Sequence, residues 1–112
     1  MRDIWLCDID GRLDESVEPV GLSSEVWRQL YPVLSEDEQR PLLSKLWQHH
    51  WGAEGDALMS LKEVQELALE VASVSDSPDG RGDDAVALFL QELGGHIALA
   101  IAHGAGLRFV AD

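Results

Sequence analysis

Residues 83–112, DDAVALFLQELGGHIALAIAHGAGLRFVAD, decide the fold because they combine a long apolar segment with clear start and stop signals. Acidic residues at the beginning favour the start of a helix, and glycines near the end favour its termination. We therefore predict a helix that begins at Asp83 or Asp84, ends near His103 and is followed by a strand at 107–110. Apolar residues surround the helix axis, so we expect this to be the most buried helix of the protein.

The N-terminal segment has the pattern of a strand that pairs with the C-terminal one. In residues 2–9, apolar side chains occupy both sets of alternating positions, so both faces of the predicted strand carry apolar residues. Asp10-Gly11 then marks a turn, and residues 11–22 contain a proline and a glycine that argue against regular structure. The two terminal strands together predict a small two-stranded sheet.

Three more helices are predicted between these strands. The first begins at Ser23 or Ser24, both good N-cap residues, and we expect Pro32 to disturb it because proline lacks the amide donor. Trp27, and Trp47 in the next helix, have apolar neighbours at helical spacing, so we expect both to be buried.

Two capping-box patterns predict where the second and third helices begin. Ser35 is followed three residues later by Glu38, and Ser60 is followed in the same way by Glu63. Each serine is therefore the expected N-cap of a helix. The predicted fold class is mainly α: a four-helix compact domain with a small two-stranded sheet from the N- and C-terminal strands, formed as a single domain by residues 1–112.

The net charge is the most unusual property of the composition. Twenty-one acidic residues against eight basic ones give a formal charge of −13, and the acids are spread along the chain rather than collected in a tail. Such a charge disfavours binding to nucleic acid or to an anionic membrane, and it favours rapid, salt-sensitive association with a basic protein. Solubility alone is the alternative interpretation.

Cys7 is the only cysteine, which excludes an internal disulfide and therefore a secreted disulfide scaffold. The N-terminal residues lack the apolar core of a signal peptide, and the longest apolar stretch, Ile97–Ala102, is too short to cross a bilayer. These features predict a cytoplasmic protein.

One short motif has the residues of a catalytic site. Ile4-Trp5-Leu6-Cys7-Asp8-Ile9-Asp10-Gly11 resembles the first motif of haloacid-dehalogenase-type phosphatases, and the resemblance implies that Asp8 is a nucleophile and Asp10 a general acid beside Mg²⁺. Arg12 stands where that family usually has threonine or valine. The family also needs a parallel sheet of several strands, which a helical chain of 112 residues cannot supply. We therefore expect no enzymatic activity and interpret the two aspartates as shaping a turn.

Residues 52–67 resemble an EF-hand calcium loop leading into its second helix, with acidic residues at three ligand positions. Gly52 stands at the first ligand position, and Ala57 stands where the sharp bend requires glycine, so an ordinary helix–loop–helix is the better prediction. The four histidines and Cys7 lack the short paired spacing of a zinc site. We expect neither a metal nor a cofactor.

Two acidic segments and one tryptophan are the candidate partner-binding residues. The acids expected to steer a basic partner are Asp10, Asp14, Glu15, Glu18, Glu36, Asp37 and Glu38. Trp51 follows two histidines at a predicted helix end. An exposed tryptophan in an acidic surface is a typical binding anchor, because it buries a large area at low entropic cost.

A small, acidic, single-domain protein that ends in a helix followed by Gly-Leu-Arg-Phe-Val-Ala-Asp, residues 106–112, resembles the immunity proteins of bacterial toxin systems. The resemblance rests on size, charge and this ending, and it transfers no functional residues. It implies a one-to-one inhibitor of a co-encoded toxin domain, and many such toxins are basic. A small acidic secretion chaperone and a degenerate EF-hand-like regulatory module are the alternative functions.

Overall fold

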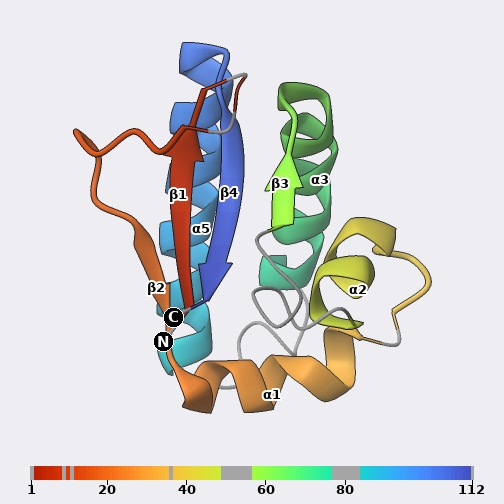
Figure 1. Cartoon of the computed structure of the whole chain (residues 1–112). Helices are drawn as coiled ribbons and strands as arrows, with labels where there is room; N and C mark the ends of the chain where they lie inside the picture. Colours follow the sequence, from red (N-terminus) through yellow and green to blue (C-terminus); the bar gives the residue numbers. More distant parts are fainter. Residues whose placement is uncertain are drawn as a thin grey trace.

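The computed structural model describes residues 2–8, 10, 12–35, 37–48, 57–76 and 84–111. Helices and strands follow one another along the chain as β1 (Arg2–Cys7), β2 (Val20–Leu22), α1 (Ser24–Leu34), α2 (Pro41–Gln48), β3 (Ala57–Met59), α3 (Leu61–Asp76), α5 (Asp84–His103) and β4 (Gly106–Ala111). The described residues thus form four helices and four strands, which confirms the predicted mainly α fold class (Figure 1).

The two terminal strands lie side by side at the centre of the sheet, as predicted. The strand order is β2-β1-β4-β3, and all three pairings are antiparallel. The β1–β4 register runs from Arg2 opposite Ala111 to Cys7 opposite Gly106. The sheet has four strands rather than the predicted two, because β2 and β3 add one short strand at each edge. Each of these strands has three residues, which is too few to show the alternation of a strand.

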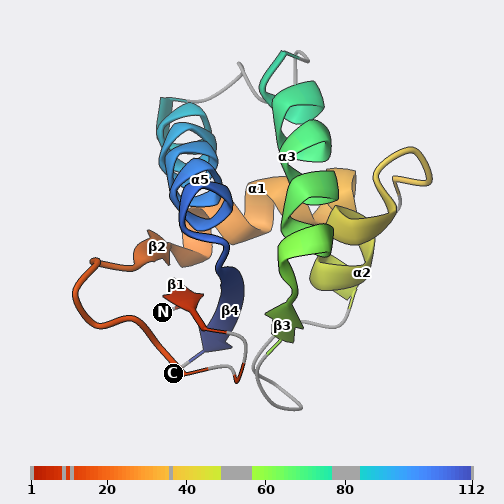
Figure 2. The same ribbon diagram turned by 90° about the horizontal axis from the view of Figure 1, so that it is seen from above.

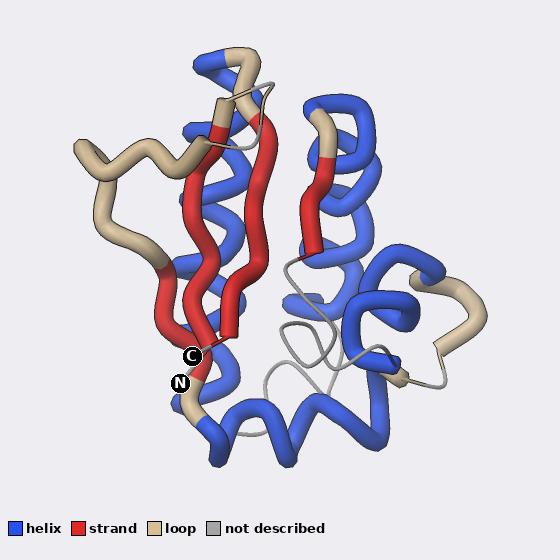
Figure 3. The backbone as a smooth tube through the Cα atoms, viewed as in Figure 1, coloured by secondary structure: helices blue, strands red, loops and turns tan. Residues whose placement is uncertain are grey.

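The helices cover one face of the sheet. Figure 2 shows α3 and α5 side by side over this face with α2 beside α3, and Figure 1 shows α1 crossing one end of the molecule. The tube in Figure 3 shows the same separation of helices and strands. The compact arrangement is consistent with a soluble protein.

Alternation along β1 and β4 decides which side chains meet the helices. Ile4 lies opposite Phe109 and Leu6 opposite Leu107, and all four side chains are buried in the core. Trp27 and Trp47 extend this core between α1 and α2, where their rings stack with centroids 5.4 Å apart. Both tryptophans are buried, as the helical spacing of their neighbours predicts.

Two of the predicted helix starts are confirmed in atomic detail. The hydroxyl of Ser23 accepts a hydrogen bond from the Val26 amide at 3.2 Å, so Ser23 is the N-cap of α1. At α3, the Glu63 amide donates to the Ser60 hydroxyl at 3.4 Å, and the Ser60 amide donates to the Glu63 carboxylate at 3.3 Å. These reciprocal bonds form the predicted capping box.

The expected start of the second helix at Ser35 is wrong. Ser35 instead ends α1, because its amide donates to the Tyr31 carbonyl at 3.0 Å. Helix α2 begins at Pro41, where the missing amide hydrogen of proline costs nothing. Pro32 also lies inside α1 without ending it, since Leu34 still packs in the core beyond the proline.

Helix α5 differs from its prediction in one respect. It contributes seven buried residues, the largest set of any described helix. However, apolar side chains also face solvent, with exposed fractions of 56% at Leu88, 41% at Leu99 and 37% at Ile101. Its length and composition alone would suit a membrane span. In this fold, one side of α5 belongs to the core and the other side is an exposed apolar surface.

Candidate functional site

The loop between β1 and β2 gathers four of the predicted partner-binding residues. Asp10, Asp14, Glu15 and Glu18 all lie on it, and all four are exposed. The loop projects from the sheet beside β2, on the left of Figure 1. Four exposed carboxylates therefore lie on one loop that leads to the edge strand β2.

Asp8 closes the first turn of this loop. Its Oδ1 atom accepts hydrogen bonds from the amides of Asp10 and Arg12, each at 2.9 Å. The Asp8 amide in turn donates to the Arg12 carbonyl at 3.0 Å. The interpretation of Asp8 as a residue that shapes a turn is confirmed by these bonds.

The second half of the loop is attached to the strand and the core. The Asp14 amide donates to the Leu6 carbonyl at 2.8 Å, and Leu13 forms a β-bridge with Cys7. Val17, which lies between Glu15 and Glu18 in the sequence, packs against the core and so holds this part of the loop in place. The backbone that carries the carboxylates is thus held at several points.

Asp14 has a local environment that favours its charged form. Ser16 donates to the Asp14 carboxylate from its hydroxyl and from its backbone amide, the latter at 3.0 Å. These two hydrogen bonds lower the pKa of Asp14; desolvation opposes this shift, and the electrostatic interaction with His103 adds to it. Asp14 is therefore ionised across the neutral pH range.

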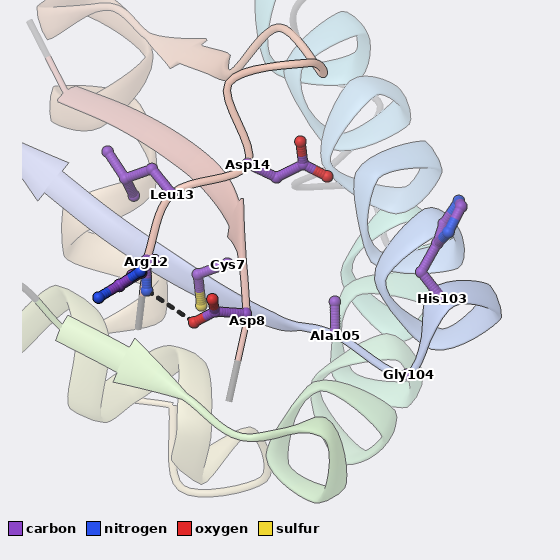
Figure 4. A pocket seen from close by; sticks show the side chains of 8 residues that line it. All are labelled: Cys7, Asp8, Arg12, Leu13, Asp14, His103, Gly104 and Ala105. Atoms are coloured by element: carbon purple, nitrogen blue, oxygen red, sulfur yellow. Dashed lines mark hydrogen bonds between the residues drawn. The ribbon is translucent and has the colours of Figure 1, made fainter. Parts of the chain in front are cut away.

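A pocket of about 440 Å³ lies beneath the loop, where β1 ends and α5 passes into β4. Figure 4 shows its lining, with Asp8, Arg12 and Asp14 on the loop side and His103 and Gly104 at the end of α5. A neighbouring pocket of about 580 Å³ shares Asp8 and Gly104 with it and extends to Leu58 of β3. The two pockets are therefore neighbours, and together they extend from the base of the β1–β2 loop to β3 at the opposite edge of the sheet.

The chemistry of the pocket does not favour a cysteine nucleophile. Cys7 is 1% exposed, and burial raises the pKa of its thiol, with a further rise from the charge of Asp8 and an opposing effect of Arg108. The thiol is therefore protonated at neutral pH, whereas the thiolate is the reactive form.

The fold also differs from the one implied by the phosphatase resemblance. That family has a parallel sheet, whereas the three strand pairings here are antiparallel. Among the described residues, no group of three or more histidine, cysteine, aspartate or glutamate side chains is placed to hold a metal ion. The first part of the EF-hand-like loop, residues 52–56, lies outside the described residues. The carboxylate of Glu63, its expected last ligand, caps α3 instead.

The second predicted acidic segment lies far from the first. Asp37 and Glu38 follow α1, on the side of the molecule opposite the β1–β2 loop in both Figure 1 and Figure 2. Asp37 forms a salt bridge with Arg40 and accepts a hydrogen bond from the Gln39 amide, so it has a structural role. Glu38 is exposed. Glu36 and Trp51 lie outside the described residues.

The structure adds a surface that the sequence interpretation missed. On the sheet face away from the helices, Trp5 lies opposite Arg108, and Arg108 lies opposite Leu58 on its other side. No helix of the described chain covers this face (Figure 2). Trp5 is partly exposed and Leu58 is 53% exposed. The alternation of Trp5 with two buried neighbours is the signal that could have identified it.

Comparisons of the chain with protein-family models, with curated proteins and with solved structures found no match. The function must therefore be inferred from the residues themselves. The β1–β2 loop can attract a basic surface over several ångströms, because its exposed charges are mainly negative, with Arg12 as the one basic residue among the described residues of the loop. The adjoining open sheet face offers the apolar contact area that charges alone do not provide.

Proposed function

We propose that this protein is an immunity protein that binds and inhibits a co-encoded bacterial toxin domain with a basic surface. The observation that carries the proposal is the β1–β2 loop, whose four exposed carboxylates stand on a backbone held by hydrogen bonds to Asp8 and Leu6. A loop that is already ordered loses less entropy on binding than a mobile one.

Charge and apolar contact have separate roles in this mechanism. The net charge of −13 and the acidic loop accelerate the approach of a basic partner. Each exposed ion pair contributes only about 0–1 kcal/mol, so the lifetime of the complex must come from other contacts. Trp5 and Leu58 on the open sheet face are suited to this role, and Trp51 remains a predicted anchor.

The proposal places the protein in the cytoplasm of the toxin-producing cell, where it protects that cell by binding alone. It requires neither a catalytic residue nor a cofactor. The strong acidity of the protein also supports inhibition by binding, because many toxins of this kind act on nucleic acid and carry a basic surface that an acidic protein can cover.

A growth assay with the product of the adjacent gene tests the proposal. We expect cells that express this product to stop growing and to recover when the protein is expressed with it. The variant Glu15→Gln/Glu18→Gln should protect less well than the wild type. The control Glu25→Gln/Glu38→Gln removes the same charge outside the loop, at two exposed positions, and should protect fully, which would exclude the predicted steering role of Glu38. A toxic gene product that neither binds the protein nor is neutralised by it would contradict the proposal.

A further inference from the structure

The larger of the two pockets at the base of the β1–β2 loop has a lining that is both apolar and charged. Its volume is about 580 Å³, and it is formed by Asp8 after β1, by residues 58–63, which run from β3 into α3, and by Gly104 and Gly106 around the turn into β4. Leu58 is 53% exposed, and a Cβ atom added at Gly104 would meet no other atom within 4 Å. The pocket is therefore open to a side chain from a partner.

Asp8 contributes a carboxylate of which the turn uses only one oxygen. Its Oδ1 atom accepts hydrogen bonds from the amides of Asp10 and Arg12, each at 2.9 Å. Its Oδ2 atom accepts no hydrogen bond from the described residues, and Asp8 forms no salt bridge with them. One oxygen thus orients the carboxylate, and the other is available to a ligand.

Glu63 contributes a second carboxylate of the same kind from the first turn of α3. Its Oε1 atom accepts hydrogen bonds from the amide and from the hydroxyl of Ser60, both at 3.3 Å. Its Oε2 atom accepts no hydrogen bond within the part of the chain that the structure describes. Two carboxylates from separate segments therefore line one pocket, and each is held in place with one acceptor oxygen to spare.

Lys62 is the one cationic residue of this lining. Its side chain is exposed and forms no salt bridge with the described residues, so it pairs with neither carboxylate. The N-terminal end of α3 would favour an anion, but Ser60 and Glu63 already cap it. A cationic group that enters the pocket therefore meets two negative charges and one positive charge.

The pocket requires a ligand with an apolar part and a positive end. A purely apolar side chain would remove water from the two carboxylates without replacing its hydrogen bonds, which is unfavourable. An anionic group would be repelled by both carboxylates. Arginine meets both requirements, because its methylene groups can lie against Leu58 and Leu61 while its five N–H donors face the carboxylates.

We propose that this pocket binds an arginine side chain of the partner protein, with the guanidinium hydrogen-bonded to Asp8 and Glu63. The inference rests on the proposed function and deepens it, since it names the side chain that a basic toxin inserts beside the β1–β2 loop. Neither carboxylate belongs to the acids that are predicted to steer the partner. The loop then brings the partner near, and the pocket fixes its orientation.

Two small peptides that differ in one charge test the proposal on the whole protein. N-acetyl-leucyl-arginine amide carries the guanidinium, and N-acetyl-leucyl-citrulline amide has a neutral urea group of nearly the same shape in its place. An NMR titration with the arginine peptide should show saturable shifts of the Gly104 and Gly106 amide signals at millimolar concentration. The citrulline peptide should bind at least about tenfold more weakly.

Four variants separate the charges of the pocket from the structural hydrogen bonds. Asp8→Asn and Glu63→Gln keep an acceptor oxygen for the turn and for the capping box, so both should fold, and each should weaken binding at least about fivefold. Lys62→Gln removes the competing cation and should strengthen binding about twofold or more. The control Glu66→Gln removes an exposed charge of α3 outside the pocket and should change the affinity by less than about twofold.

Three results would overturn the proposal. Equal binding of the two peptides would mean that the guanidinium contributes nothing. Weaker binding after Lys62→Gln would make the pocket a site for an anionic or carbonyl group. Equal losses with Asp8→Asn and Glu66→Gln would reflect net charge alone.

The peptide titration and the growth assay fail independently of each other. A protein that binds the arginine peptide as described but does not neutralise the product of the adjacent gene would keep the arginine site and lose the immunity function. A protein that neutralises this product but binds both peptides equally would keep the immunity function and lose the arginine site.

Discussion

His96 is the one buried ionisable residue of α5, and its side chain lies in the core with 5% exposure. Burial lowers the pKa of His96, and a hydrogen bond with the backbone of Ile4 opposes the shift only in part. Its Nε2 atom has no hydrogen-bond partner among the described residues. The neutral imidazole is therefore the form that the fold accepts.

The free energy of unfolding should depend on pH through this residue. As the pH falls below about 6.5, the usual histidine value, the unfolded chain binds a proton at His96 that the folded chain does not bind. Stability should therefore be complete above this pH and should decrease until the pH reaches the lowered pKa of the folded state. Urea unfolding between pH 5 and 7.5 should show that His96→Gln removes part of this decrease. The control Gln91→Ala, at an exposed position of the same helix that does not titrate, should leave it unchanged. Identical pH profiles for the wild type and His96→Gln would contradict this account.

Helix α2 depends on α3 for its N-terminal cap. The residue before Pro41 is arginine, which cannot accept hydrogen bonds from the free amides of the first turn. The carboxylate of Glu70 on α3 accepts them instead, from Leu42 at 3.2 Å and from Leu43 at 3.0 Å. Arg40, the residue before α2, donates a further hydrogen bond to Ser73 at 2.9 Å, so three hydrogen bonds join α3 to the start of α2.

Removal of this cap should destabilise the protein although Glu70 is only partly buried. We expect Glu70→Ala to lower the free energy of unfolding by about 0.5–2 kcal/mol, the usual effect of losing an N-cap. Glu66→Ala, on the same helix and exposed, should change it by less than about 0.5 kcal/mol. Chemical denaturation of both variants checks the prediction, and equal losses would show that Glu70 acts through its charge and not as a cap.

The elements show which features can be predicted from local sequence. Ser60–Glu63 and Ser35–Glu38 have the same capping-box spacing, yet only the first forms the box. The second fails because α1 continues to Leu34, and the real cap of α2 is Glu70, which is remote in sequence. A local pattern cannot reveal a cap that comes from another helix.

The candidate binding surfaces also differ in whether one short segment of sequence or only the folded chain reveals them. The four acids of the β1–β2 loop were predictable as a group because one short segment carries them all. Trp5 and Leu58 were not, because they share a face only through the β1–β4 and β3–β4 registers. The exposed side of α5 was interpreted as buried, since apolar residues in the core and on an exposed face have the same composition.

At the scale of the whole molecule, the charge of −13 is combined with two surfaces that expose apolar side chains. The acidic loop borders the open sheet face, and a second apolar face lies on α3 and α5. Because each exposed charge contributes little affinity, the acids should act mainly on the rate at which a basic partner arrives. The apolar contacts should then determine how slowly it leaves.

Binding kinetics with the product of the adjacent gene, the proposed toxin, at low and physiological salt, test this account most directly. The association rate of the wild type should fall as salt rises, because ions screen the loop over about 10 Å at 0.1 M. Glu15→Gln/Glu18→Gln should associate more slowly and depend less on salt, with an almost unchanged dissociation rate. Glu25→Gln/Glu38→Gln should behave like the wild type. An association rate that is independent of salt, or that both double variants reduce equally, would contradict recognition through the β1–β2 loop.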